Sequence, residues 1–179
     1  MLPDEILIRA QQLDGAALSE IHDRYYPEIY RYVHYRLENE QVCEDISAEV
    51  FVRLLDALHR KRGPVQNLRG WLFGTASNLV NDHLRARYAS RVDIYDVDEV
   101  DLVDKAHPEQ TYEEDWTQKK VLQALWELTP EQQHVLALRF SEERSLEETA
   151  SLMGKSVTAV KGLQFRAIAS LRRLLEDIM

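Results

Sequence analysis

Residues 145–166, SLEETASLMGKSVTAVKGLQFR, decide the fold. Ser145 and Glu148 have the spacing of a capping box, in which each side chain accepts from the other residue's backbone N–H at the start of a helix. Gly154 fits the left-handed position that ends a helix, and Ser156 can cap the helix that follows. Two helices joined by a tight turn at residues 154–156 form a helix-turn-helix.

The residues before this stretch begin another helix. Thr129, Pro130 and Gln132 place an N-cap, a first-turn proline and a capping-box glutamine in order. The C-terminal module is therefore predicted to contain short helices followed by one long helix that runs from Ser156 to about Glu176.

The long helix has an inward and an outward face. The inward face comprises Val157, Val160, Gln164, Ala167, Leu171 and Leu174, and the outward face comprises Thr158, Lys161, Phe165, Arg166 and Ala169. In a DNA-binding helix-turn-helix, the N-terminal half of the outward face enters the major groove. Lys161 and Arg166 are long enough to contact guanine edges or phosphates. A solvated helix face with scattered charge is the alternative interpretation.

Phe165 is unusual on an outward face. A phenylalanine there contacts a thymine methyl group, contacts a protein partner, or belongs to a core whose position on the helical wheel is slightly rotated. Gln164 stands where an apolar residue is expected, which leaves the rotated core open as an interpretation.

The first half of the chain is also predicted to be helical, which makes the fold class all-α. Gly and Pro number only 6 and 5 in 179 residues, and no long run alternates apolar and polar residues. Pro27 predicts a kink or a break in the first of three amphipathic helices. The apolar faces of the three helices are Leu18, Ile21, Tyr25, Ile29, Tyr32 and Val33; Ile46, Val50, Phe51, Leu54, Leu55 and Leu58; and Leu68, Leu72, Thr75, Ala76, Leu79 and Leu84.

The distribution of charge divides the chain into two modules. The chain has 22 basic and 31 acidic residues and a net charge of −9. Much of the excess acid falls in one stretch without helical or strand period, Asp93, Asp96, Asp98, Glu99, Asp101 and Asp104. We therefore expect a helical domain at 1–91, an acidic linker at 92–111 and the helix-turn-helix domain at 112–179.

A basic cluster in the first module suggests a nucleic-acid surface. His59-Arg60-Lys61-Arg62-Gly63-Pro64 precedes a helix that carries Trp71, Phe73, Asn78, Asn81, Arg85 and Arg87. Cations that contact phosphates beside rings that stack on bases are typical of single-strand binding. The alternative is that Trp71 and Phe73 belong to the core and that the arginines are solvated.

Several classes of protein are not supported by the sequence. The six histidines are dispersed, and neither a phosphate-binding loop nor a nucleophile elbow is present, so we expect neither an enzyme nor a metal or cofactor site. A single cysteine, Cys43, cannot form an internal disulfide. No apolar run approaches the roughly 20 residues of a membrane span, and no secretory signal is visible. A cytoplasmic protein without membrane insertion is expected.

Taken together, four strings resemble bacterial RNA polymerase sigma factors of the extracytoplasmic-function group. Residues 23–32 resemble the family's opening helix, and residues 43–54 resemble its core-binding helix. Residues 67–73, with 78 and 82–85, resemble its minus-ten helix. Residues 128–132, 147–150 and 156–161 resemble its minus-thirty-five domain. Each string alone is weak, but their order and spacing match the family across most of the chain. The recognition helix is less basic than in many members.

The resemblance implies partners and site residues. The partners are core RNA polymerase, promoter DNA and an anti-sigma factor, and the acidic linker is similar in position to the segment that passes through polymerase channels. The implied polymerase-binding residues are Asp45, Glu49, Arg53 and Asp56. The implied minus-ten residues are Arg60, Lys61, Arg62, Asn67, Arg69, Trp71, Asn78, Asp82 and Arg85. The implied minus-thirty-five residues are Lys155, Ser156, Thr158, Lys161, Phe165 and Arg166.

Two other functions remain open. The chain is either a promoter-specificity subunit, a helix-turn-helix regulator that binds duplex DNA on its own, or a protein-interaction module that has kept the fold. The net charge of −9 disfavours independent binding to duplex DNA, because phosphate contacts are made mainly by cations.

Overall fold

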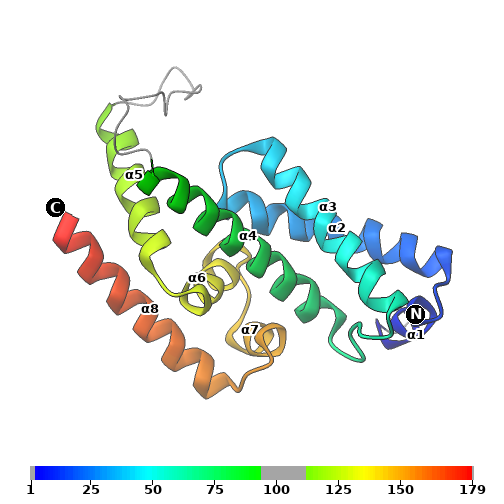
Figure 1. The fold of residues 1–179 in the computed structure, drawn as a ribbon. Helices are drawn as coiled ribbons and strands as arrows, with labels where there is room; N and C mark the ends of the chain where they lie inside the picture. The colour runs from blue at the N-terminus through cyan, green and yellow to red at the C-terminus, as the bar shows by residue number, and fades with distance from the viewer. Residues whose placement is uncertain (1–2, 94–111, 179) are drawn as a thin grey trace.

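Helices form all the regular secondary structure in the computed structural model, which describes residues 3–93 and 112–178 (Figure 1). The all-α fold class is therefore confirmed for the described residues. The helices in chain order are α1 (Pro3–Gln11), α2 (Gly15–Arg36), α3 (Glu40–His59), α4 (Leu68–Asp93), α5 (Tyr112–Glu127), α6 (Pro130–Leu136), the π-helical turn η1 (Ala137–Ser141), α7 (Leu146–Met153) and α8 (Val157–Ile178).

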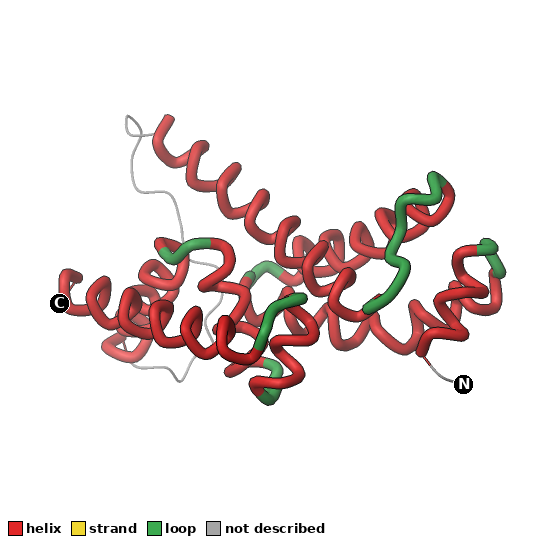
Figure 2. Tube along the Cα trace, turned by 90° about the horizontal axis from the view of Figure 1, so that it is seen from below, coloured by secondary structure: helices red, strands yellow, loops and turns green. Residues whose placement is uncertain are grey.

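The long helix α4 runs through the middle of the molecule, with helices from both halves of the chain on its sides (Figure 1). It contacts α2 and α3 from the first half and α6 and α7 from the second half. Figure 2 shows the same helices from below, with α8 and the C-terminus at the end of the molecule opposite the N-terminus. The predicted linker 92–111 lies outside the described residues except for the last turn of α4, so the proposed domain boundaries stay a prediction.

Two apolar cores hold the helices together. The first is formed by α1 to α4 and includes the fully buried side chains of Tyr32 and Phe73. It also contains Ala137, Leu138 and Leu152, which come from the second half of the chain. The second core is formed by Leu128, Val135, Leu136, Ala150, Val160, Leu163 and Ala167. The halves therefore bury apolar surface against each other, and each buried leucine contributes roughly 1.5–3 kcal/mol.

For the first half, the sequence predicted a kink or a break at Pro27 and a place for Leu55 in the apolar face of α3. Pro27 does not break α2, which continues from Gly15 to Arg36. Buried Tyr25 and Ile29 hold the helix on either side of the proline, and such packing outweighs a lost backbone hydrogen bond. Leu55 does not belong to the apolar face of α3, because its side chain is exposed.

A buried polar network joins α2, α4 and α6. Arg36 is only 8% exposed and donates to the Tyr32 hydroxyl (3.1 Å), the Ser77 hydroxyl (3.1 Å), the Asn81 carbonyl oxygen (2.6 Å) and the carbonyl oxygen of Gln133. These acceptors are all neutral. The network therefore ties the second half of the chain to the first without neutralising the buried guanidinium.

His134 on α6 extends this network. Its Nδ1 lies 2.6 Å from the Tyr32 hydroxyl. Burial, together with the positive charge of Arg36, lowers the pKa of His134 to about 3. The imidazole is therefore neutral at physiological pH, and protonation would place a second positive charge beside Arg36.

The lowered pKa of His134 predicts a pH-dependent loss of stability. Because the unfolded chain binds this proton near pH 6.5 and the folded chain does not, the free energy of unfolding should fall as the pH falls from about 6.5 towards 3. The slope is about 1.4 kcal/mol per pH unit for one proton. Urea unfolding between pH 7 and 5 measures it, as the difference between the wild type and His134→Gln.

The matched control is His59→Gln, because His59 is exposed at the end of α3. It should keep the wild-type slope. An equal pH slope in His134→Gln and the wild type would mean that His134 is protonated equally in the folded and unfolded states.

Candidate nucleic-acid interface

The helix-turn-helix is formed by local signals as the sequence predicts. The Ser145 hydroxyl accepts from the Glu148 N–H (3.0 Å), and the Glu148 carboxylate accepts from the Ser145 N–H (2.8 Å), which lowers the pKa of Glu148. Gly154 ends α7 with a φ of 62°, a conformation that costs a side-chain-bearing residue energy. Ser156 then caps α8 by accepting from the Ala159 N–H (3.1 Å).

The outward face of α8 is solvent-exposed as expected. Thr158, Lys161 and Arg166 are exposed, and Phe165 is 75% exposed, which excludes a place in the core for this ring. Leu163, which was not assigned to the inward face, is buried in the second core. Gln164 is half-buried, and its carbonyl oxygen accepts from Arg139 Nε (2.8 Å). A polar residue is therefore tolerated on the inner side of α8 because it has a partner on η1.

A hollow of about 160 Å³ lies at the N-terminal end of this face. Lys155, Thr158 and Arg166 line it together with Glu131 from α6. The Lys155 ammonium group lies 3.1 Å from the Glu131 carboxylate. Of the predicted minus-thirty-five residues, Lys155 thus has an acidic partner, whereas Phe165 projects freely into solvent.

The basic loop between α3 and α4 projects from the first half of the chain. Arg60, Lys61 and Arg62 are exposed, and Arg60 pairs with Asp56 (3.0 Å). The Pro64 carbonyl accepts from Gln11 Nε2 on α1 (3.0 Å), which holds the loop in place. Val65 beside it is 84% exposed. The predicted basic cluster is therefore accessible to solvent. It lies beside an exposed apolar residue, Val65, which the charge pattern did not reveal.

The predicted minus-ten residues at the start of α4 and along it differ in exposure and contacts. Asn78, Asp82 and Arg85 are exposed along the middle of α4, and Arg85 lies 3.8 Å from Asp82. Trp71 is half-buried and packs against the first core, in agreement with its structural interpretation. Asn67 and Arg69 at the N-terminal end make contacts that the sequence did not predict.

Asn67 and Arg69 contact groups outside α4. The side-chain Oδ1 of Asn67 accepts from the Gly70 N–H (3.1 Å), which caps α4, and Nδ2 of the same amide donates to the Ser151 carbonyl on α7 (2.7 Å). Arg69 donates to the Glu28 carboxylate of α2 through Nε (3.0 Å) and Nη2 (2.6 Å). Both residues are therefore occupied by protein partners in this arrangement.

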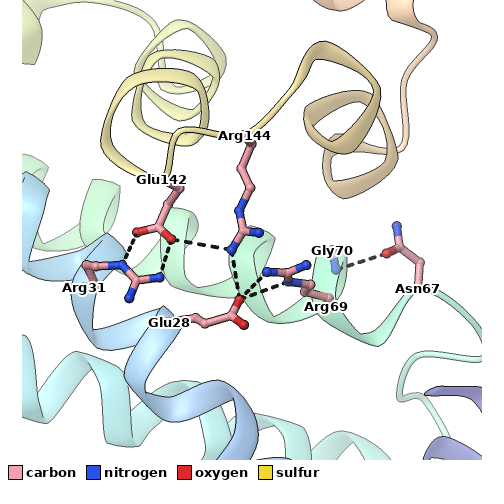
Figure 3. A network of polar contacts seen from close by, with 7 residues as sticks. All are labelled: Glu28, Arg31, Asn67, Arg69, Gly70, Glu142 and Arg144. Atoms are coloured by element: carbon pink, nitrogen blue, oxygen red, sulfur yellow. Dashed lines mark hydrogen bonds and ion pairs between the residues drawn. The ribbon is translucent and has the colours of Figure 1, made fainter. Parts of the chain in front are cut away.

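The Arg69–Glu28 pair belongs to a five-residue charge network at the boundary of the two halves (Figure 3). Glu28 also accepts from Arg144 Nη2 (3.1 Å), and Arg144 lies 3.6 Å from Glu142. The Glu142 carboxylate is fully buried and accepts two bonds from Arg31, of 3.2 and 3.0 Å, which raise the pKa of Arg31. Glu28, Arg31, Glu142 and Arg144 were not predicted as members of this network. The two pairs that join the halves, Arg31–Glu142 and Glu28–Arg144, link residues 111 and 116 positions apart.

The predicted polymerase-binding residues lie along the outer side of α3. Asp45 accepts from Gln41 (3.0 Å), and Glu49 pairs with Arg53 (3.2 Å). The same helix exposes Val52 (55%) and Leu55 (46%). This side of α3 therefore presents charged side chains together with two exposed aliphatic ones.

The described residues offer no metal site, since no three His, Cys, Asp or Glu side chains gather there. Cys43 is buried, and its burial raises the pKa of the thiol. None of the helices in the described ranges combines the length and apolar character that a membrane span requires.

Comparison with protein families gives matches to both halves of the chain. Residues 21–89 match the model of sigma-70 region 2, and residues 124–173 match that of sigma-70 region 4. The chain is 34% identical over 174 residues to the ECF RNA polymerase sigma factor BldN of Streptomyces coelicolor. That alignment covers 97% of this chain and 66% of BldN.

Solved structures share the fold. CnrH in complex with the cytosolic domain of CnrY has a TM-score of 0.62 at 23% identity, and the match covers 97% of both chains. The sigma factor RpoE of Bartonella quintana, in complex with the anti-sigma factor NepR, has a TM-score of 0.54 at 18% identity over 88% of this chain and 96% of that one. The matches to regions 2 and 4 in order, together with the 34% identity to BldN, show that the chain belongs to the sigma-70 family, in its extracytoplasmic-function group.

Proposed function

We propose that the chain is a sigma factor that binds core RNA polymerase, directs it to promoters by reading minus-ten and minus-thirty-five elements, and helps to melt the DNA. The observation that carries this proposal is the presence of regions 2 and 4 in order on one chain, with an exposed helix-turn-helix face in the second. A plain helix-turn-helix regulator needs no region 2. The chain then acts in the cytoplasm, as a specificity subunit without a catalytic step of its own.

The negative net charge is compatible with this function. A chain of charge −9 binds promoter DNA poorly by itself, but within the holoenzyme the polymerase supplies much of the cationic surface. An acidic linker complements a positively lined channel. The proposal also includes an anti-sigma factor as inhibitor, because the similar RpoE structure is a complex with one.

Transcription in vitro tests the function directly. Purified chain and core polymerase are incubated with a library of promoter sequences, and the transcripts are sequenced. Enrichment of two motifs at the spacing of minus-ten and minus-thirty-five elements is the expected result. Tight, specific duplex binding by the free chain, with no effect on polymerase, would support the independent regulator instead.

Charge reversal on α3 should weaken polymerase binding. The double variant Asp45→Lys/Glu49→Lys should lower the affinity for core enzyme by at least about tenfold, because it replaces attraction across the interface with repulsion. Asp45 is exposed and Glu49 is half-buried, so each substitution should change the free energy of unfolding by only about 0.5 kcal/mol. Fluorescence anisotropy with labelled chain measures the affinity, and thermal unfolding measures the stability.

Glu176→Lys/Asp177→Lys is the matched control, because it makes the same change in charge at exposed positions near the end of α8. It should bind core enzyme like the wild type. Equal affinities for both double variants would mean that the charged stripe of α3 is only solvated surface.

Arg166 is expected to read one base of the minus-thirty-five element. Its guanidinium can donate two hydrogen bonds to a guanine. Arg166→Ala should cost about 1–3 kcal/mol at one promoter position and relax the preference there. Transcription on single-base promoter variants measures this. A phosphate contact would instead give a uniform loss and a salt slope lower by about one.

Arg172→Ala controls for loss of charge, since Arg172 is exposed on the C-terminal half of the same helix. If Arg166→Ala keeps wild-type output and preference on every promoter variant, the reading face of α8 has been assigned incorrectly.

A further inference from the structure

The short helix α1 contacts the basic loop between α3 and α4, residues 60–67, across 53 positions of sequence. Nε2 of Gln11, the last residue of α1, donates to the Pro64 carbonyl (3.0 Å), and Figure 1 shows α1 beside this loop. Pro64 is buried, whereas Val65 next to it is exposed. The bond therefore fixes the backbone directly next to an exposed apolar side chain.

The helix α1 is itself attached to the first core. Ile6, Leu7 and Ala10 are buried there. The turn after α1 is closed by an ion pair of 2.8 Å between Arg9 and Asp14, and Asp14 also caps α2. The end of α1 that reaches the basic loop is therefore a fixed point in the first half of the chain.

The basic loop begins in a conformation that needs support. Lys61 has a φ of 56°, in the left-handed region that glycine prefers. Its N–H donates to the Leu58 carbonyl (3.1 Å), and the Arg62 N–H donates to the Ala57 carbonyl (2.8 Å). This is the arrangement that ends many helices, usually with glycine at the position of Lys61. A lysine there stores strain, and such strain persists only where the surrounding structure holds it.

The side chains of the basic loop differ in how precisely they must be placed. Arg60, Lys61 and Arg62 are exposed cations, and their Coulomb attraction to a phosphate falls slowly with distance. Val65 acts only through van der Waals contact, and a gap of about 0.5–1 Å already forfeits a quarter to a half of that attraction. A loop released from α1 would therefore keep its attraction to phosphates and lose its apolar contact.

We propose that α1 is a brace for the basic loop and that Gln11 is a positioning residue for promoter recognition. Through the Pro64 carbonyl, Gln11 holds Val65 where it packs against an unpaired base of the minus-ten strand. The choice of this strand as ligand rests on the proposed function, whereas the brace rests on the contacts of α1. The helix α1 lies outside residues 21–89, which match region 2, so the brace is an addition to the matched region.

Two substitutions at Gln11 remove the bond without altering the core, because this side chain is exposed. Gln11→Met has a similar length but no donor, and Gln11→Glu places a carboxylate, which can only accept, against the Pro64 carbonyl. Gln12→Met and Gln12→Glu are the matched controls, since they make the same changes at the next exposed position. Thermal unfolding should show that all four variants fold.

Proteolysis tests the brace on the free chain. Trypsin cleaves after lysine and arginine, and Arg60, Lys61 and Arg62 are exposed in the basic loop. At low trypsin concentration, cleavage follows the population of locally opened molecules. Fragments ending at residues 60–62 should form about fivefold faster in both Gln11 variants than in the Gln12 variants, as expected for one lost hydrogen bond.

Transcription with core polymerase tests the positioning role. On promoters with single-base changes, both Gln11 variants should discriminate about fivefold less at one minus-ten position, and discrimination within the minus-thirty-five element should stay at the wild-type level. The salt dependence of transcription should not change, because the cations keep their phosphates. Lys61→Ala should instead lower the salt slope by about one.

Equal cleavage rates in the Gln11 and Gln12 variants would overturn the brace. Faster cleavage with wild-type minus-ten discrimination would overturn the positioning role. Failure of the proposed function looks different, because the wild-type chain then gives no transcript with core polymerase while the difference in cleavage rates remains. That result would overturn the assigned ligand and leave the brace in place.

Discussion

The fully buried carboxylate of Glu142 requires cationic partners, and this requirement fixes how the two halves of the chain meet. A charge removed from water is tolerated only when it is paired and hydrogen-bonded. Arg31 of the first half supplies two hydrogen bonds, and Arg144 lies on its other side. Leu138 and Leu152 of the second half are buried in the first core, among side chains of the first half. The polar contacts thus set the position of η1 and α7 on α2 and α4. The apolar contacts supply the area over which the two halves meet.

The local structure could be predicted because its signals are local. Both capping boxes, the left-handed Gly154 and the exposed face of α8 follow from spacings of three or four residues. The short α1 and the π-helical turn were not predicted, since neither has a distinctive sequence pattern. Helical periodicity also finds the centre of an apolar face better than its edge. For this reason Leu55 was placed in the core although it is exposed.

The candidate site was less predictable where it depends on contacts between residues far apart in the sequence. Asn67 and Arg69 were identified from their position on α4, but their partners Ser151 and Glu28 lie 84 and 41 residues away. The role of Gly70 also depends on such a contact. Its environment shows that the missing side chain makes room for a backbone carbonyl of α7. Tertiary proximity of this kind leaves no periodic signal in a single sequence.

The π-helical turn η1 has a consequence for how this region can vary. The turn closes with a bond from the Glu142 N–H to the Ala137 carbonyl, which accommodates one residue more than an α-helical turn. It allows Val135 and Leu136 to belong to the second core and Ala137 and Leu138 to the first. Loss of one residue would rotate every later side chain by about 100° relative to α6. In related sequences, natural selection should therefore preserve the length of this segment more strictly than its composition.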